Sequence, residues 1–561
     1  MFSAVLWRVY LLPALSLICL SIAAKPADGT AISASPPVNL GYATYQGASY
    51  FDPFTTRTNT QFLGVRYAAP PIGSLRFAAP QKPGTVADIQ MADQQPNLCY
   101  QANNGQQAQS PYRQGAHRRQ SEDLGTSEDC LFLNVFVPGK VGDSKNLPVV
   151  AWIHGGGYIE GGAGYSFYGY NGYNGNDLIR ASNGTAIVVV FQYRLGVFGF
   201  LAGQKVKDGG VLNAGLLDQQ FALKWIQDNI SKFGGDPQKV TIWGESAGAG
   251  SVLQHLVANG GKTNPPLFRA AITSSTFLPS QYKYNDRIPE TMYNRTLAVA
   301  GCTTAKDSLQ CLRGTDVSTL QIANTAISQS GFFGTFTWVP VVDGSFISDR
   351  PTVLLKQGKV NSNNYLGVTN VDEGSIFVNQ NLPVVSPTTP LLYVANLFPV
   401  MEVSNATAAT QVYSSFGTTY QQGVQMMADS IFLCPTYYVL KAFEKKAAFK
   451  SEFAIPPGSH GNDLAYYWPD GDNVIPDYNN QPFIDGFSQS FANFWTSLDP
   501  NKKWDDKNIT PLWKTWTSAT KVEMHFGEAE TGVPDVKAIS SSDALLQRCN
   551  FWDSISAATA Q

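Results

Sequence analysis

The stretch Gly244-Glu245-Ser246-Ala247-Gly248 lies between an apolar run typical of a β-strand, 240–243, and a helix-like segment, 249–257. In a Gly-x-Ser-x-Gly pentapeptide the serine occupies a tight strand-to-helix turn, and the glycines let neighbouring backbone approach. This turn exposes the serine hydroxyl and directs the N–H groups of the helix N-terminus toward any negative charge that forms beside it. A glycine-rich turn with an incidental serine would also match the pentapeptide, but the flanking strand and helix favour a nucleophile elbow at Ser246.

A serine hydroxyl needs a base to remove its proton, and the chain holds five histidines. His117 lies in a polar stretch, and His154 precedes three glycines. His255 is too far along the helix that follows the serine, and His525 follows a β-like run near the C-terminus. His460 lies in a loop that proline and glycine keep out of regular structure. Because functional side chains are usually presented from such loops, we predict His460 as the base.

An acidic partner of the histidine is expected between the serine and the histidine along the chain. The best candidate position is the turn 370–374, which follows a short predicted strand, 365–369. This turn holds both Asp372 and Glu373, and the residue pattern does not choose between them. Either would lie at the C-terminal edge of a strand, where open α/β sheets place their sites.

A predicted strand, 149–153, runs into His154-Gly155-Gly156-Gly157-Tyr158. The backbone N–H groups of such a glycine motif bind the oxygen of a tetrahedral intermediate. A triple glycine after a strand could also be a flexible loop. Its place upstream of the serine, in the expected order, favours an oxyanion hole.

Other motifs are long and follow one another in a fixed order. They are Phe62-Leu63-Gly64-Val65-Arg66-Tyr67-Ala68, Ser127-Glu128-Asp129-Cys130-Leu131-Phe132-Leu133-Asn134, Tyr193-Arg194-Leu195-Gly196-Val197-Phe198-Gly199-Phe200, Phe233-Gly234-Gly235-Asp236-Pro237 and Val339-Pro340-Val341-Val342-Asp343-Gly344. With the serine and glycine motifs, they resemble the type B carboxylesterases, a group that includes cholinesterases, carboxylesterases and the larger fungal lipases. The resemblance implies an α/β-hydrolase fold: a large, mostly parallel central sheet flanked by helices, in a single catalytic domain.

The resemblance also implies roles for individual residues. It implies Ser246 as nucleophile, Glu373 rather than Asp372 as acid, His460 as base, and the N–H groups of Gly156, Gly157 and Ala247 as oxyanion donors. It further implies two structural ion pairs, Arg194 with Asp218 and Arg66 with Glu128.

Residues 1–24 are predicted to be a secretory signal peptide, with Arg8 before an apolar run, 9–22, and the small residues Ala23 and Ala24 at the cleavage site. Residues 25–561 then form the carboxylesterase type B catalytic domain. We find no second apolar run long enough to span a bilayer, so we expect a secreted, extracellular protein without stable membrane anchoring.

Removal of the signal peptide would leave six of the seven cysteines, a number that can pair completely. Their spacing does not select the pairing, but the resemblance implies Cys99 with Cys130, Cys302 with Cys311, and Cys434 with Cys549. The candidate N-glycosylation sites, all expected in surface loops or at helix ends, are Asn183, Asn229, Asn294, Asn405 and Asn508. The sequence lacks Cys-x-x-Cys motifs and histidine clusters, so we expect neither a metal nor a cofactor.

Composition agrees with one large domain that acts on a small-molecule or lipid ester. Motifs of one site extend from residue 154 to residue 460, so the chain of 561 residues cannot be divided between them. A net charge of −3 gives no electrostatic case for nucleic acid. Neither composition nor spacing indicates an oligomeric state.

The segment from Cys99 to Cys130 bears on the substrate, because in related fungal lipases it is an apolar lid. Here it is polar and holds few apolar residues, so we expect little affinity for an oil surface. Its aromatic residues include Tyr100 and Tyr112 but no tryptophan, so we do not expect the choline specificity of cholinesterases.

Substrate contacts are also predicted for aromatic residues near the motifs. The candidates are Tyr158, Phe333, Phe336 and Trp338, with ordinary core packing as the alternative. The run 161–176 either forms the rim of the site or is a simple loop.

The predicted function is a secreted serine carboxylic-ester hydrolase that works through a Ser-His-Glu triad and an acyl-enzyme. The alternatives are a triacylglycerol or sterol-ester lipase, an aromatic-acid (feruloyl-type) esterase, and, from a different class, a non-catalytic cholinesterase-like adhesion protein.

Overall fold

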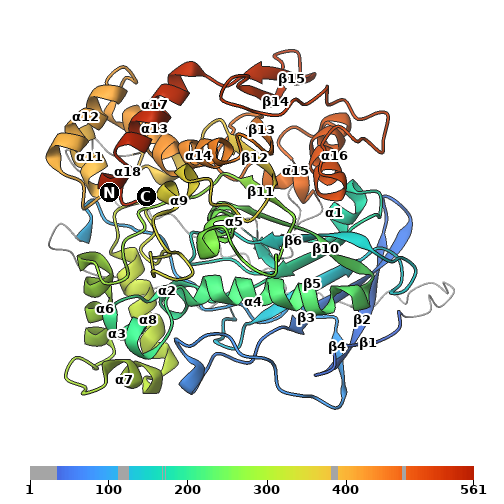
Figure 1. Cartoon of the computed structure of the whole chain (residues 1–561), viewed down its shortest axis with the longest axis horizontal. Helices are drawn as coiled ribbons and strands as arrows, with labels where there is room; N and C mark the ends of the chain where they lie inside the picture. The colour runs from blue at the N-terminus through green and yellow to red at the C-terminus, as the bar shows by residue number, and fades with distance from the viewer. Residues whose placement is uncertain (1–34, 112–124, 167–168, 171, 381–388, 470–475) are drawn as a thin grey trace, which may run out of the picture. The chain divides into compact units, whose positions relative to one another are not determined.

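Parallel strands of almost entirely apolar residues form the centre of the computed structural model (Figure 1). The structure describes residues 35–561 except for 112–124, 167–168, 171, 381–388 and 470–475. The predicted signal peptide, His117 and Tyr112 therefore lie outside the described residues. Among the described helices, none combines the length and apolar character needed to cross a bilayer.

The main sheet has thirteen strands, and its order is β1-β2-β3-β5-β9-β6-β10-β11-β12-β13-β14-β15, with β4 paired to β2. The run from β9 to β14 is parallel, while the outer pairs at both ends are antiparallel, β4 on β2 excepted. The strands are β1 (Val38–Asn39), β2 (Thr44–Asp52), β3 (Arg57–Arg66), β4 (Ile89–Ala92), β5 (Phe132–Val137), β6 (Leu147–Ile153), β9 (Ile187–Phe191), β10 (Gly235–Glu245), β11 (Ala270–Ser274), β12 (Asn364–Asn370), β13 (Ala447–Ala454), β14 (Val522–Glu528) and β15 (Pro534–Ser540); a separate hairpin joins β7 (Tyr165–Ser166) and β8 (Gly169–Tyr170).

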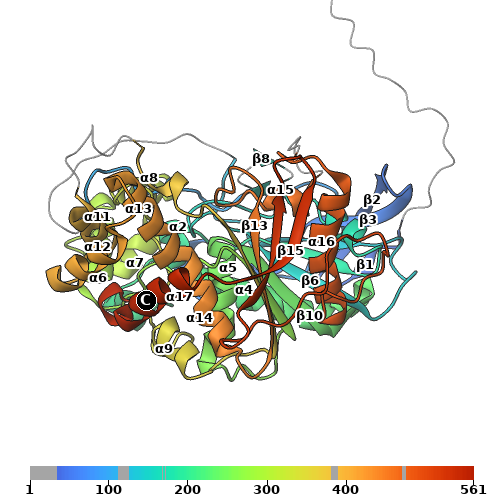
Figure 2. The same cartoon turned by 90° about the horizontal axis from the view of Figure 1, so that it is seen from above.

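Helices cover both faces of this sheet (Figure 1). They are α1 (Asn176–Ala181), α2 (Gly196–Phe200), α3 (Gln204–Gly209), α4 (Ala214–Asn229), α5 (Ala247–Val257), α6 (Arg287–Val299), α7 (Ser308–Gly314), α8 (Val317–Gln329), α9 (Pro351–Lys356), α11 (Pro390–Leu397), α12 (Val403–Tyr413), α13 (Thr419–Met427), α14 (Cys434–Ala442), α15 (Leu464–Tyr467), α16 (Gln481–Ser497), α17 (Asp543–Ser554) and α18 (Ser556–Thr559). Helices α6, α7, α8, α11, α12 and α13 gather beside the sheet in both views (Figures 1 and 2).

Successive side chains of β6 pack into two different hydrophobic cores, which shows why both faces of the sheet are buried. Val149, Ala151 and Ile153 belong to a core that includes α4 and α5, whereas Val150 and Trp152 belong to a second core with α16. Because successive side chains of a strand point to opposite faces, an all-apolar strand requires cover on both sides. The predicted α/β-hydrolase fold, with a large and mostly parallel sheet between helices, is confirmed.

The turn at Ser246 depends on close backbone packing. Ser246 has φ 56° and ψ −123°, a conformation that non-glycine residues rarely adopt. A Cβ atom on Gly248 would lie 2.0 Å from the carbonyl oxygen of Ile153, at the end of β6, and a Cβ on Gly244 would lie 2.4 Å from the backbone of Gly248. Both glycines of the pentapeptide are therefore required sterically.

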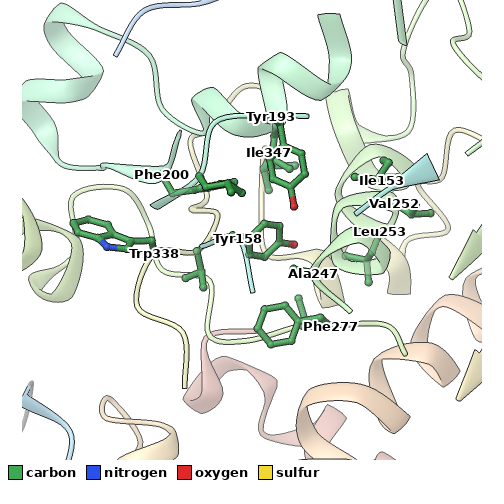
Figure 3. Packing of buried hydrophobic residues seen from close by; sticks show 14 of the residues in the cluster. Ile153, Tyr158, Tyr193, Phe200, Ala247, Val252, Leu253, Phe277, Trp338 and Ile347 are labelled. Atoms are coloured by element: carbon green, nitrogen blue, oxygen red, sulfur yellow. The ribbon is translucent and has the colours of Figure 1, made fainter. Parts of the chain in front are cut away.

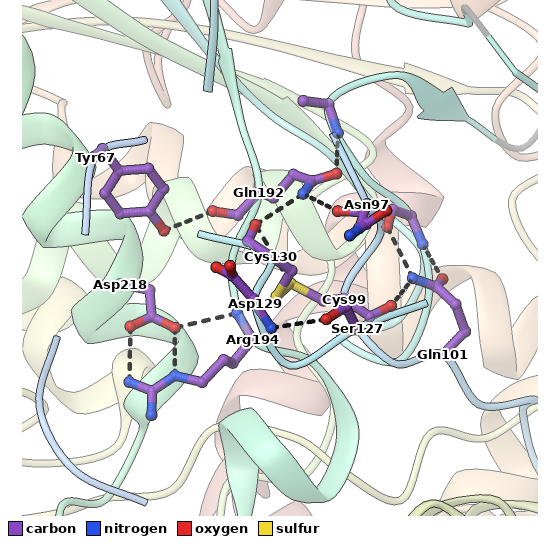
Figure 4. The surroundings of a disulfide bond; sticks show 12 residues. Tyr67, Asn97, Cys99, Gln101, Ser127, Asp129, Cys130, Gln192, Arg194 and Asp218 are labelled. Carbon is purple, nitrogen blue, oxygen red and sulfur yellow. Dashed lines mark hydrogen bonds and ion pairs between the residues drawn. A yellow bond between two sulfur atoms is a disulfide. The ribbon is translucent and has the colours of Figure 1, made fainter. Parts of the chain in front are cut away.

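Two ion pairs were predicted, and one of them is wrong. Arg194 and Asp218 form a buried pair with 2.7 Å between nitrogen and oxygen (Figure 4). Arg66, in contrast, pairs with Asp129 at 2.6 Å instead of with Glu128. Glu128 points the other way and forms a nearly buried pair with Arg76, also at 2.6 Å. The side chains of these two adjacent acids diverge, so each serves a different arginine.

The disulfides join Cys99 to Cys130, Cys302 to Cys311 and Cys434 to Cys549, the pairing that the resemblance implies. Around the first of them, the Gln192 side chain donates to the backbone carbonyls of Asn97 and Cys130, at 2.8 Å each (Figure 4). Gln192, directly after β9, thus binds the backbone at both ends of the Cys99–Cys130 segment.

The sequons differ in accessibility. Asn183 and Asn294 are exposed, and Asn405 is half-buried. Asn229 and Asn508 are only 8% and 5% exposed, and their side-chain amides donate to the carbonyl of Trp225 and to the side chain of Gln489. The expectation of a surface position is therefore wrong for Asn229 and Asn508, because tertiary packing covers them.

We predict that Gly248→Ala lowers the free energy of unfolding by about 3 kcal/mol, because the added methyl group overlaps the Ile153 carbonyl. Thermal or urea unfolding of the purified variant measures this loss. Gly314→Ala is the control, since a Cβ at Gly314 would meet nothing within 4 Å, and its stability should match or slightly exceed wild type. Equal stability of the two variants would show that the elbow tolerates a side chain at Gly248.

Candidate active site

Ser246 lies between β10 and α5, and it is 7% exposed. Its N–H donates to the carbonyl of Ser274 at 2.9 Å, and its own carbonyl accepts from the N–H of Gly250 at 2.8 Å. Ala247 begins α5, so its N–H has no acceptor within the helix. The nucleophile candidate and one oxyanion-donor candidate therefore meet at a helix N-terminus, where the dipole favours negative charge.

Glu373 and His460 come together because they follow adjacent parallel strands, β12 and β13. The Nδ1 atom of His460 lies 2.6 Å from the Oε2 atom of Glu373. The Glu373 side chain is fully buried, and its Oε1 atom accepts hydrogen bonds from the backbone N–H of Asn370 and the hydroxyl of Ser275, at 2.7 Å each. These bonds hold the carboxylate in one orientation beside the imidazole.

Asp372, the other acid of this turn, has different partners. Its N–H donates to the carbonyl of Gly458 at 2.8 Å, and its carboxylate accepts from the N–H of Ser375 at 3.2 Å. Asp372 therefore organises the turn, and the geometry favours Glu373 as the partner of the histidine.

The second ring nitrogen of His460, Nε2, lies 3.2 Å from Oε1 of Glu245, the residue before the serine. Burial lowers the pKa of His460, but the hydrogen bond and charge of Glu373, with Glu245 and Asp463, outweigh it and raise the pKa above its usual value. Burial in turn raises the pKa of Glu245 to about 8 and that of Asp463 to about 6. A base must be neutral to accept a proton, so activity through His460 should rise with pH as its imidazolium deprotonates.

Two phenylalanines enclose the imidazole. The rings of Phe377 and Phe432 lie 5.0 Å and 4.4 Å from that of His460, centroid to centroid. Phe432 comes from a π-helix, Ala428–Leu433, between α13 and α14. Such π-helical turns are frequent at functional sites, and this one brings an aromatic ring to the histidine.

The glycine motif packs directly on the elbow. A Cβ on Gly155 would lie 2.7 Å from the Glu245 carbonyl oxygen, and one on Gly157 would lie 1.9 Å from the ring of Phe336. Gly156 and Gly157 also have positive φ, +90° and +61°. This segment therefore needs glycine for conformation and for close contact, and it brings two further backbone donors near Ser246.

His154 supports this loop instead of acting as a base. It is completely buried, and burial lowers its pKa to about 4, so the ring is neutral. Its Nδ1 atom lies 3.0 Å from the carbonyl oxygen of Gly155, and its ring stacks on that of Tyr193 at 4.4 Å. Since C=O and N–H point oppositely in a trans peptide, fixing the Gly155 carbonyl also fixes the direction of the Gly156 N–H.

Ser246 and His460 line one chamber of about 420 Å³ together with the three glycines, Glu245 and Glu160. None of the described lining residues is lysine or arginine. A second, smaller chamber of about 70 Å³ lies behind Phe336 and Phe377, which line both. The second chamber is mainly apolar, with walls that include Phe277, Val339, Leu397, Met427, Ile431 and Phe432.

Three of the four predicted substrate contacts are placed elsewhere. Only Phe336 lines the chambers. Tyr158 and Trp338 are completely buried in the hydrophobic core (Figure 3), and Phe333 is half-buried and lines neither chamber. The prediction is therefore wrong for Tyr158, Phe333 and Trp338, because neighbours in sequence point in different directions. The alternative of core packing holds for Tyr158 and Trp338.

Residue patterns missed four residues around the site. Phe377 and Glu160 belong to no motif that we used, Phe432 is notable only as a sequence neighbour of Cys434, and Ser275 carries no signal of its own. Glu245 stands inside the pentapeptide, so its contact with His460 could have been suspected from the sequence.

The first part of the polar Cys99–Cys130 segment is bound to the loop before the second chamber. Its residues 105–107 form a ladder with residues 329–335, in which the N–H of Gly105 donates to Thr335 at 2.8 Å and that of Phe333 donates to Gln107 at 2.8 Å. A Cβ on Gly105 would lie 2.0 Å from the Phe332 carbonyl oxygen. Asn104, next to this ladder, lines the chamber that contains Ser246.

Comparison with known proteins agrees with this arrangement. The profile of the carboxylesterase family matches residues 34–552. The chain belongs to the carboxylesterase family. Lipase 2 of Diutina rugosa is 30% identical over 88% of this chain and 92% of its own length. A secreted lipase of Arthroderma benhamiae is 30% identical over 78% of this chain and 85% of its own length.

Among solved structures, EstA of Aspergillus niger is similar with a TM-score of 0.80 and 31% identity, over 94% of this chain and 99% of its own. The family match and these relatives identify the protein as a carboxylic ester hydrolase. The esterase activity predicted from the sequence is thereby confirmed, and the adhesion alternative is set aside.

We predict that Glu373→Gln lowers kcat/KM at neutral pH by about 10³- to 10⁴-fold, because the amide cannot stabilise the imidazolium of His460. The matched control is Asp372→Asn, which changes the neighbouring acid and should keep activity within a few-fold of wild type. Initial rates on a soluble ester measure both. A larger loss of kcat/KM in Asp372→Asn than in Glu373→Gln would assign the acid role to Asp372.

Proposed function

We propose that this esterase hydrolyses its substrates through a Ser246-His460-Glu373 triad and an acyl-enzyme intermediate. The observation that carries the proposal is the 2.6 Å contact between His460 and buried Glu373, in a chamber that Ser246 and the glycine loop also line. His460 accepts the Ser246 proton as the hydroxyl attacks the ester carbonyl. The imidazolium, oriented by Glu373, then protonates the leaving alcohol, and water repeats the sequence on the acyl-enzyme.

The negative charge of each tetrahedral intermediate is bound by the N–H groups of Gly156, Gly157 and Ala247. Loss of one such donor typically costs about 3 to 4 kcal/mol of transition-state stabilisation. The close packing of the glycine loop on the elbow supports this role, because preorganised donors need no rearrangement during the reaction.

We further propose that the enzyme is secreted and acts on soluble esters. The signal-like residues 1–24, the three disulfides and the secreted lipases among its relatives support secretion. The polar residues 101–107, bound to 329–335, favour soluble esters over an oil surface. Lipases among the relatives keep triacylglycerol or sterol-ester hydrolysis as the second candidate.

The first test compares p-nitrophenyl esters of increasing acyl length, with each substrate carried through its solubility limit. We expect saturation below that limit, and a loss of at least about 10⁴-fold in Ser246→Ala. An unchanged melting temperature of the variant shows that it is folded. A rate that rises only above the solubility limit would identify a lipase, and full activity in Ser246→Ala would refute the triad.

The shared wall of the two chambers generates a prediction on acyl length. Phe336→Ala removes a ring that lies between them, so the ratio of octanoate to butanoate turnover should rise several-fold. Phe333→Ala is the matched control, because Phe333 lines neither chamber and its loss should leave the ratio unchanged. An equal ratio in wild type and Phe336→Ala would show that acyl groups do not reach the second chamber.

A further inference from the structure

Glu160 follows the glycine loop and folds back onto it. Its N–H donates to the carbonyl of Gly156 at 3.0 Å. A Cβ atom on Gly156 would lie 2.7 Å from Cγ of Glu160, so the glutamate side chain runs along the proposed oxyanion donor. Glu160 also lines the chamber that contains Ser246, and its side chain is exposed there.

The Glu160 carboxylate has no hydrogen bond or ion pair with any described residue. The titratable groups that line the same chamber are Glu245, His460, Tyr165 and Tyr173, and the described lining holds no lysine or arginine. His154 lies beneath the adjacent Gly161 and is neutral. No described residue therefore supplies a permanent cation to Glu160.

This position has an electrostatic consequence for catalysis. An ionised carboxylate beside Gly156 repels the negative charge that forms on the substrate oxygen, and the repulsion is strong where water is partly excluded. A cation contributed by the substrate would remove this penalty and form a charge-assisted hydrogen bond with Glu160. A substrate cation thus offsets a charge that the described protein leaves unbalanced.

We infer that Glu160 is a specificity-determining residue that selects esters whose alcohol portion carries a protonated amine. The inference rests on the proposed ester hydrolysis at Ser246. The alcohol portion is assigned because Phe336, over Gly157, leads toward the apolar second chamber, which suits an acyl chain. Glu160 lies over Gly156 instead of Gly157, so an acyl chain that extends past Phe336 leaves the space beside Glu160 to the alcohol portion.

The selectivity should depend on pH. Although the Glu160 side chain is exposed to the chamber, the surrounding protein removes part of its water, and this desolvation raises its pKa to about 7. The carboxyl group is therefore neutral below this pH and ionised above it. The preference for a cationic ester should therefore increase between pH 6 and pH 8. Comparing two esters at each pH cancels the titration of His460, because both substrates need the neutral base.

The test uses 3-(dimethylamino)propyl butanoate and its neutral isostere, 4-methylpentyl butanoate. We expect the wild-type enzyme at pH 8 to favour the amine ester at least about tenfold in kcat/KM, as for hydrogen bonds to charged groups. Glu160→Gln keeps the shape of the side chain and should reduce the ratio to about one while turning over the neutral ester at an equal or higher rate. Glu402→Gln, an exposed acid at the start of α12, controls for net charge and should keep the wild-type ratio.

Several outcomes would overturn the inference. One is a wild-type ratio near one at pH 8 with normal turnover of the neutral ester, and another is an unchanged ratio in Glu160→Gln. A preference for ethyl 4-(dimethylamino)butanoate over ethyl 5-methylhexanoate, without one in the first pair, would place the cation on the acyl side and refute the assignment. If the wild-type enzyme hydrolyses none of the four esters, the proposed function itself fails, which distinguishes the two.

Discussion

The contact between two backbone segments, the end of β6 and the first turn of α5, is the constraint on which the site depends. A side chain at Gly248 would overlap the carbonyl of Ile153, and a side chain at Gly155 would overlap the carbonyl of Glu245. Because adjacent parallel strands end at one edge of the sheet, this contact brings the glycine loop to Ser246, the proposed nucleophile. A strained serine and a loop of positive φ persist here because the surrounding sheet holds both of them.

The same strand order explains the rest of the proposed triad. Strands β12 and β13 are neighbours, so Glu373, shortly after the end of β12, and His460, shortly after the end of β13, meet at one edge of the sheet. Burial of Glu373 removes water from its contact with the imidazole and strengthens the electrostatic interaction. The second acid near the ring, Glu245, is buried in the elbow itself, so the histidine lies between two carboxyl groups.

Aromatic rings connect the catalytic groups to the substrate space. Phe377 and Phe432 contact the imidazole, while Phe336 covers Gly157, and the ring of Phe336 also contacts that of Phe377 at 6.0 Å. The wall of the second chamber is thus continuous with residues that contact His460 and Gly157, the proposed base and one proposed oxyanion donor.

The sequence by itself determined the features that rest on local rules. The glycines around Ser246 and in residues 155–157 follow from backbone sterics, and the apolar strands follow from burial on both faces of a parallel sheet. Family motifs, which record the whole fold, implied the disulfides and the fold class.

Tertiary structure decided which side chains face the site. Asp372 and Glu373 are adjacent and chemically alike; the family resemblance implied Glu373, and in the structure it is Glu373 that contacts His460. Phe336 reaches the chamber, whereas Phe333 and Trp338 do not. Arg66 pairs with Asp129 and not with Glu128. In both cases the direction of a side chain depends on the path of the backbone. Glu160 shows no sequence signal, because its position beside Gly156, without a cation among the described residues, arises only when the loop is folded.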